Sequence, residues 1–190
     1  MIRTRFGCRV VAKTWHRGLL AILAVVVIHQ GFAAQAATIR VAACQAQQRV
    51  INFRLESEEV LAAVDQNLAA LESIVHRAGE QQCDALAFPE DTLGLLHWVG
   101  MNESTAAEVL SQVVPRMLDR LGRAAASHHM YLVACSDFVE ADGAMYNTAF
   151  FLGRDGKEIG RYHKVCPTWS ESGARQPGTS LPVTLIWKVV

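Results

Sequence analysis

Two charged residues lie at the ends of strand-like segments, where their side chains could take part in catalysis. Glu90 comes directly after an apolar run and Pro89, and Lys164 lies about 70 residues further along the chain. A carboxylate at the mouth of a cavity can act as a general base, and an ammonium can stabilise negative charge in a transition state. Each residue also has an ordinary alternative, because solvated loop carboxylates such as Asp91 and surface lysines are common. His163, beside Lys164, fits a packed or solvent-facing histidine.

The segments that carry Glu90 and Lys164 point to a function more specifically when they are considered with other motifs of the chain. They belong to an ordered set of short motifs, namely 39–45 (IRVAACQ), 87–90 (AFPE), 131–134 (YLVA), 146–149 (YNTA), Asp155-Gly156 and 160–164 (GRYHK). In order and spacing this set resembles the nitrilase superfamily of carbon-nitrogen hydrolases. The resemblance covers roughly residues 39 to 183.

The resemblance implies a fold and a set of catalytic residues. Members of the family fold as an α-β-β-α sandwich and use a glutamate, a lysine and a cysteine, with a second glutamate in many members. By resemblance, Glu90 is the general base and Lys164 is the cation that stabilises the tetrahedral intermediate. The stretch 164–171 (KVCPTWSE) is similar to the family's lysine, proline-threonine and glutamate arrangement, which makes Glu171 the candidate second glutamate.

The implied reaction is hydrolysis of a non-peptide carbon-nitrogen bond in a small nitrile or amide. A thiol attacks the nitrile or amide carbon, the carboxylate accepts the thiol proton and later activates water, and the ammonium stabilises the developing charge. The products are a carboxylic acid and ammonia or an amine. The resemblance further implies that no cofactor is needed and that homo-oligomers are common.

The chain departs from the family pattern after residue 183. Members continue there with a glycine-bearing strand and a turn that deliver the nucleophilic cysteine, whereas this chain reads TLIWKVV over 184–190. Cys166 would share a strand face with Lys164, but it is an ordinary cysteine by position and we assign no nucleophile. We therefore expect an incomplete sandwich with little or no turnover.

The elements that must position these residues follow from the hydrophobic pattern. We predict strands over 39–44, 85–88, 130–135, 146–152 and 158–165, and helices over 57–79 and 105–129. Ser57 is the expected N-cap, Gly79 the expected stop, and Pro115 the expected start of a further helix. Asp155-Gly156 predicts a type I′ turn. The alternation of strands and helices predicts an α/β fold with its site at the carboxyl ends of strands.

The N-terminal segment has the composition of a secretory signal. Five of the 18 Lys and Arg residues and no acidic residue precede residue 38, and an apolar run over 18–28 leads to the small-residue segment 33–37. The apolar run is shorter than the roughly 20 residues of a membrane span. We predict cleavage and an extracytoplasmic location, with an uncleaved anchor or an over-extended start as alternatives. The expected parts are a leader (1–37), the N-terminal portion of a hydrolase domain (38–183) and an aberrant tail (184–190).

The net charge and the cysteine positions argue against nucleic acid and structural zinc. After the leader, 13 basic and 18 acidic residues leave a net charge of 13 − 18 = −5 without a basic stripe, which argues against nucleic acid. Cys44, Cys83 and Cys135 lie in or beside apolar runs, so we expect reduced core thiols. No cysteine pair has C-x-x-C spacing, which argues against structural zinc.

Two other interpretations remain open. The chain could be a gene fragment or a non-catalytic binding or regulatory half-domain that pairs with another chain, although the apolar stretch 178–190 would then need cover. It could also belong to a membrane-tethered acyltransferase of the same superfamily, although a single apolar segment is fewer than such proteins carry.

Overall fold

The computed structural model of the protein describes residues 38–45, 49–169, 171 and 173–179. The chain divides into two units after Thr38, and every element described below belongs to the second. The predicted leader and the predicted tail lie outside the described residues, so cleavage, export and the part boundaries stay predictions. In the described part of the chain, no helix has the length and apolar character needed to cross a membrane.

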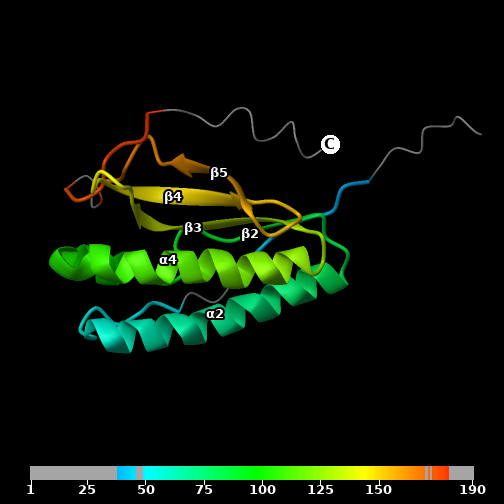
Figure 1. Cartoon of the computed structure of the whole chain (residues 1–190), viewed down its shortest axis with the longest axis horizontal. Helices are drawn as coiled ribbons and strands as arrows, with labels where there is room; N and C mark the ends of the chain where they lie inside the picture. Colours follow the sequence, from blue (N-terminus) through cyan, green and yellow to red (C-terminus); the bar gives the residue numbers. More distant parts are fainter. Residues whose placement is uncertain (1–37, 46–48, 170, 172, 180–190) are drawn as a thin grey trace, which may run out of the picture. The chain divides into compact units, whose positions relative to one another are not determined.

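Five strands form one sheet in the order β1-β2-β3-β4-β5 (Figure 1). The strands are β1 (Val41–Ala43), β2 (Ala85–Ala87), β3 (Tyr131–Val139), β4 (Met145–Leu152) and β5 (Glu158–His163). The first three strands pair in parallel, whereas β3 with β4 and β4 with β5 pair antiparallel. Because β2, β3 and β5 run in one direction, their carboxyl ends and the start of β4 meet at the same end of the sheet.

Helices connect the parallel strands. Helix α2 (Ser57–Glu80) lies between β1 and β2 in the chain, and α3 (Leu96–Met101) and α4 (Glu103–Ala126) lie between β2 and β3. The long helices α2 and α4 lie on the same side of the sheet (Figure 1). They share a core whose fully buried members include Val60, Val64, Leu68, Leu110, Val113, Met117 and Leu121. Ion pairs of Asp65 with Arg116 at 2.7 Å and of Glu72 with Arg120 at 2.6 Å also join the two helices.

The two faces of the sheet differ because strand residues alternate between them. Leu132 and Phe150 are buried in the core that the helices share. Val133 and Phe151 are partners in the β3–β4 ladder, point to the opposite face and are only half-buried. No described helix covers that face (Figure 1). The predicted α/β class is therefore confirmed, and the described residues form one helical layer and one sheet of the α-β-β-α sandwich.

Helix α4 corrects the prediction that Pro115 starts a new helix. Pro115 lies inside one continuous helix. It is exposed, as is Ser111 one turn earlier, whose carbonyl oxygen loses its intrahelical donor. Water can satisfy that oxygen at the exposed face, so the helix continues.

The ends of α2 also differ from the prediction. Its N-cap is Glu56 rather than Ser57, and the Glu56 N–H donates to Glu59 Oε2 at 3.1 Å. Gly79 does not stop the helix, which continues to Glu80. A Cβ at Gly79 would lie 2.1 Å from the His128 ring, so this glycine makes room for a side chain that follows α4.

The hairpin between β4 and β5 does not contain the predicted type I′ turn. Gly156 has a φ of +76°, but Asp155 is not among the residues with positive φ. The Gly156 N–H donates to the Gly153 oxygen at 2.9 Å, and the Gly153 N–H to the Lys157 oxygen at 2.8 Å. This pattern fits a turn followed by one left-handed glycine, which is the common three-residue hairpin loop.

Candidate active site

Three segments meet at the end of the sheet where β2 and β5 finish and β4 begins. Pro89 and Glu90 follow β2 within a few residues, Lys164 follows β5 directly, and Asn147 is the third residue of β4. The Lys164 N–H donates to the Asn147 oxygen at 2.9 Å, which continues the ladder one residue beyond β5. The predicted strand end at residue 165 is thus two residues too late, and Lys164 begins a loop.

Glu90, Lys164 and Glu171, the three residues predicted from the sequence, lie together. Lys164 Nζ lies 2.5 Å from Glu90 Oε1 and 2.9 Å from Glu171 Oε2. Asn147 Nδ2 donates to Glu90 Oε1 at 3.0 Å and to Glu171 Oε1 at 2.9 Å. One ammonium and one amide therefore hold both carboxylates. The catalytic roles of the three residues stay predictions.

Glu171 is the buried member of this group, with its side chain 5% exposed. Burial raises the pKa of Glu171, but hydrogen bonds from Lys164 and Thr168 outweigh that effect and lower the pKa to about 2. The Thr168 N–H and Oγ1 donate to Glu171 Oε2 at 2.7 and 2.8 Å. Burial lowers the pKa of Lys164, but the hydrogen bonds to Glu90 and Glu171 raise it above its ordinary value. Both groups are therefore charged at neutral pH.

Glu90 differs from Glu171 in its exposure. The Glu90 side chain is 51% exposed, because no described segment covers it on the solvent side. The described residues therefore do not supply the enclosure that a general base at the mouth of a cavity would have.

A buried ion pair supports the loop that carries Glu171. Arg175 Nε and Nη2 donate to the two carboxylate oxygens of Asp137 at 2.8 and 2.5 Å, and the side chains are 3% and 2% exposed. Burial raises the pKa of Asp137, although the Arg175 guanidinium acts in the opposite direction. The next N–H, that of Gln176, donates to the Met145 oxygen of β4 at 2.8 Å. The loop is thus attached to both β3 and β4.

The charged group lines a cavity of about 460 Å³. Glu90, Lys164 and Glu171 contribute charged groups to its lining, and Val50, Leu96 and Met101 contribute apolar surface. Leu96 and Met101 belong to helix α3, and Asp91 orients the start of this helix. Asp91 Oδ1 accepts hydrogen bonds from the Leu95 and Leu96 N–H groups at 2.8 and 3.2 Å. Burial raises the pKa of Asp91, although these backbone hydrogen bonds oppose the effect.

None of the four described cysteines lines this cavity, and Cys83, Cys135 and Cys166 are free thiols. Cys83 is buried, and Cys44 and Cys135 are half-buried. Burial, together with the charge of Glu90, raises the pKa of the Cys135 thiol to about 11. Cys166 is exposed in the loop after β5, so it does not share a strand face with Lys164 as the sequence suggested.

His163 lies outside the group of charged residues. Its ring stacks on Tyr146 with a centroid separation of 4.2 Å, and its Nδ1 lies 3.0 Å from Thr148 Oγ1. Its Nε2 lies 3.2 Å from Glu140 Oε1. This histidine therefore packs against the hairpin.

Asn147, Asp137, Arg175 and the α3 residues that line the cavity were not predicted as site residues. The Tyr-Asn-Thr-Ala motif that contains Asn147 was visible in the sequence. Asparagine is uncommon within a strand, and that is a signal for a buried polar role. Nothing in the sequence pairs Asp137 with Arg175, because their contact depends on how the loop after β5 returns to β3.

The comparisons with known proteins agree with this fold. The chain is similar to an amidase from Nesterenkonia sp. AN1 in complex with acrylamide, with a TM-score of 0.62 and 21% identity, over 80% of this chain and 52% of that chain. A second solved form of the Nesterenkonia AN1 amidase, described as from the nitrilase superfamily, gives a TM-score of 0.59 and 20% identity, over 76% of this chain and 51% of that chain. A third form, in complex with butyramide, gives a TM-score of 0.58 and 23% identity, over 75% of this chain and 49% of that chain.

These likenesses define the class of fold as that of nitrilase-superfamily amidases, and the chain spans about half the length of those structures. The carbon-nitrogen hydrolase family model matches residues 40–188, so the chain belongs to the carbon-nitrogen hydrolase family. Among curated proteins, none matches the chain significantly.

Proposed function

We propose that this chain supplies the general base and the stabilising cation of a carbon-nitrogen hydrolase that acts on a small nitrile or amide through a Glu-Lys-Cys mechanism. The main support is the contact of Lys164 Nζ with Glu90 Oε1 at 2.5 Å, on the wall of a cavity. Glu171 and Asn147 hold this pair from the buried side. A base and a permanent cation that share one small cavity can serve the two charge changes of acyl transfer.

In the proposed reaction with an amide, a cysteine thiol adds to the carbonyl carbon and its proton passes to Glu90. The negative charge that develops on the substrate oxygen is stabilised by the Lys164 ammonium. The proton then passes to the substrate nitrogen, the carbon-nitrogen bond breaks, and ammonia leaves a thioester. Water attacks the thioester after losing a proton to Glu90, which releases the carboxylic acid and restores the thiol.

The described part of the chain does not place a thiol at the cavity. None of the described cysteines lines the cavity, and the pKa of Cys135, raised to about 11, leaves that thiol protonated at neutral pH. We infer that the 190-residue chain alone has little or no turnover, and that the nucleophile belongs to the part of the fold that its relatives have in addition.

The substrate is proposed to be small and uncharged at its acyl end. Val50, Leu96 and Met101 add apolar surface to the lining of a cavity of about 460 Å³ that also holds the charged group. A solved relative binds acrylamide and another form binds butyramide, which are small amides with apolar acyl groups. An extracytoplasmic location and a homo-oligomeric state are proposed from the leader and from the family resemblance.

The test begins with the source gene. Sequencing through the codons for Leu181 to Val190 and translating all frames beyond them shows whether a cysteine-bearing strand follows. The longest product should release ammonia from butyramide, and Glu90→Gln or Lys164→Met should reduce kcat by about 10²-fold or more. Wild-type rates in both variants would contradict the assigned roles. N-terminal sequencing of exported protein should give Ala37 or Thr38 as its first residue.

A further inference from the structure

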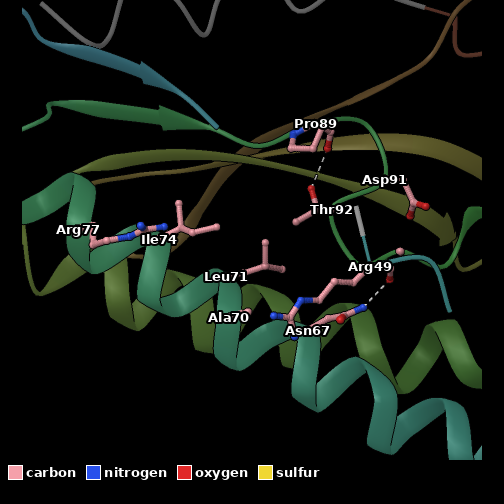
Figure 2. Close-up of a pocket in the computed structure, with 10 residues that line it drawn as sticks. Arg49, Asn67, Ala70, Leu71, Ile74, Arg77, Pro89, Asp91 and Thr92 are labelled. Carbon is pink, nitrogen blue, oxygen red and sulfur yellow. Dashed lines mark hydrogen bonds between the residues drawn. The ribbon is translucent and has the colours of Figure 1, made fainter. Parts of the chain in front are cut away.

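A second cavity lies on the other side of the segment that carries Glu90. It has a volume of about 210 Å³ and lies between α2 and residues 89–94 (Figure 2). Arg49 and Arg77 line it together with Ala70, Leu71 and Ile74 of α2 and with Pro89 and Thr92 opposite. The catalytic group does not use this cavity.

The two arginines differ from every other described arginine. Neither the Arg49 nor the Arg77 guanidinium has a hydrogen bond, an ion pair or a ring contact within the described ranges. The other eight have one each or more: Arg40, Arg54, Arg116, Arg120, Arg123, Arg154, Arg161 and Arg175. Arginine is permanently charged and presents a planar set of donors that matches a carboxylate. Two such groups on one small cavity favour an anion.

The one acidic residue on the cavity does not neutralise the arginines. Asp91 accepts hydrogen bonds from the Leu95 and Leu96 N–H groups, and in Figure 2 the Arg49 side chain extends away from it towards α2. The nearest neutral polar groups are also engaged. Asn67 Nδ2 donates to the Arg49 and Leu93 oxygens at 3.0 and 2.9 Å, and Thr92 Oγ1 donates to the Pro89 oxygen at 3.0 Å.

The remaining surface is apolar and small. Ala70, Leu71, Ile74 and Pro89 surround the space, and about 210 Å³ is less than the roughly 300 Å³ at the lower end of drug-sized sites. We propose that this cavity binds a small aliphatic carboxylate, attracted by the charges of Arg49 and Arg77, which lie at opposite ends of the cavity on either side of Leu71 (Figure 2), with its alkyl chain against α2.

The position of this cavity suggests a link with the Glu90 site, and this link rests on the proposed function. Asp91 lines both cavities, and Glu90 precedes it in the segment that separates them. A carboxylate bound in this cavity would lie against the same backbone segment that positions Glu90. The proposed reaction releases a carboxylic acid, so a product of that reaction has the chemistry of this second site.

The test is a titration of the full 190-residue chain with butyrate, followed through backbone amide NMR signals. Saturable shifts are expected at Leu71, Ile74 and Thr92. Arg49→Gln and Arg77→Gln should each weaken binding about two- to fivefold, because exposed ion pairs contribute about 0.2–1 kcal/mol. Arg54→Gln, an exposed arginine outside the cavity, is the matched control and should leave affinity unchanged. Equal affinity in all three variants would refute the site.

One cavity-filling variant and two further ligands test whether binding depends on the charge of the ligand and on the shape of the cavity. Ala70→Leu fills the cavity while both arginines remain, and it should abolish the butyrate shifts. Butyramide, which is neutral, should not shift these signals, and inorganic phosphate should shift them less than butyrate because it has no alkyl chain. Equal shifts with butyramide or phosphate would overturn the proposal. None of these readouts needs hydrolysis, so the site can fail or stand independently of the proposed function.

Discussion

Glu90 and Glu171 accept hydrogen bonds from the same nitrogen, Asn147 Nδ2, at 3.0 and 2.9 Å. The same two carboxylates also share the Lys164 ammonium. Two carboxylates that share two donor nitrogens repel each other. The positive charge of the ammonium and the dipole of the amide offset this repulsion and so make the arrangement possible. The exposed Glu90 is in this way connected to the buried Glu171 without direct contact.

Replacing Asn147 by leucine should destabilise the fold. It removes a donor to the buried Glu171 Oε1, which leaves that oxygen unsatisfied at a cost of about 1–3 kcal/mol. Urea denaturation followed by circular dichroism measures the change. Asn147→Asp should be worse at pH 7 than at pH 4, because a third carboxylate repels the other two only when it is ionised. A pH-independent loss in the aspartate variant would argue against this account.

Lys164→Met should cost more stability than Glu90→Gln. Removing the ammonium leaves the buried Glu171 carboxylate without its charged partner, at a cost of about 2 kcal/mol. Glu90 is half-exposed and its loss should cost less than about 1 kcal/mol. Equilibrium unfolding of the two variants in parallel gives the comparison, and equal losses would show that Glu171 is not electrostatically dependent on Lys164.

The stabilising contribution of Glu171 to the free energy of unfolding should be lost at acid pH. Its pKa is about 2 in the folded chain and 4.5 ordinarily, so the unfolded state binds more protons between these values. The contribution is fully present above about pH 4.5 and is lost as the pH falls towards 2. It should be at most about 3 kcal/mol. Asp91 and Asp137, whose pKa values are raised, act in the opposite direction. The decisive quantity is therefore the difference between wild type and Glu171→Gln, which should shrink below pH 4.5.

Removing only one partner of the Asp137–Arg175 ion pair should strongly lower the free energy of unfolding. Arg175→Met leaves a carboxylate that is 2% exposed without a partner, and such single losses cost about 3–5 kcal/mol. Asp137→Leu combined with Arg175→Met should recover much of that loss, because apolar replacements of buried pairs are often tolerated. A double-mutant cycle by chemical denaturation measures the coupling. Additive losses would show that the pair acts as two independent groups.

Local patterns in the sequence are sufficient to predict the α/β class, most of the strands and both long helices. These depend on local periodicity, and the apolar positions of α2 and β3 repeat at helical and strand spacing. The order of motifs also indicated Glu90, Lys164 and Glu171 before any contact was known. The structure brings them within hydrogen-bond distance because the carboxyl ends of β2 and β5 meet at one end of the sheet.

The surroundings of these three residues depend on contacts between elements that are distant in the chain. Strand register places Asn147 between two carboxylates, and the return of the loop after β5 places Arg175 against Asp137. Neither contact can be found from local pattern, because the partners lie on separate elements whose spacing along the chain carries no signal. The continuation of α4 through Pro115 also depends on tertiary contacts. Burial of the α4 face against α2 and the sheet outweighed a local preference to end the helix there.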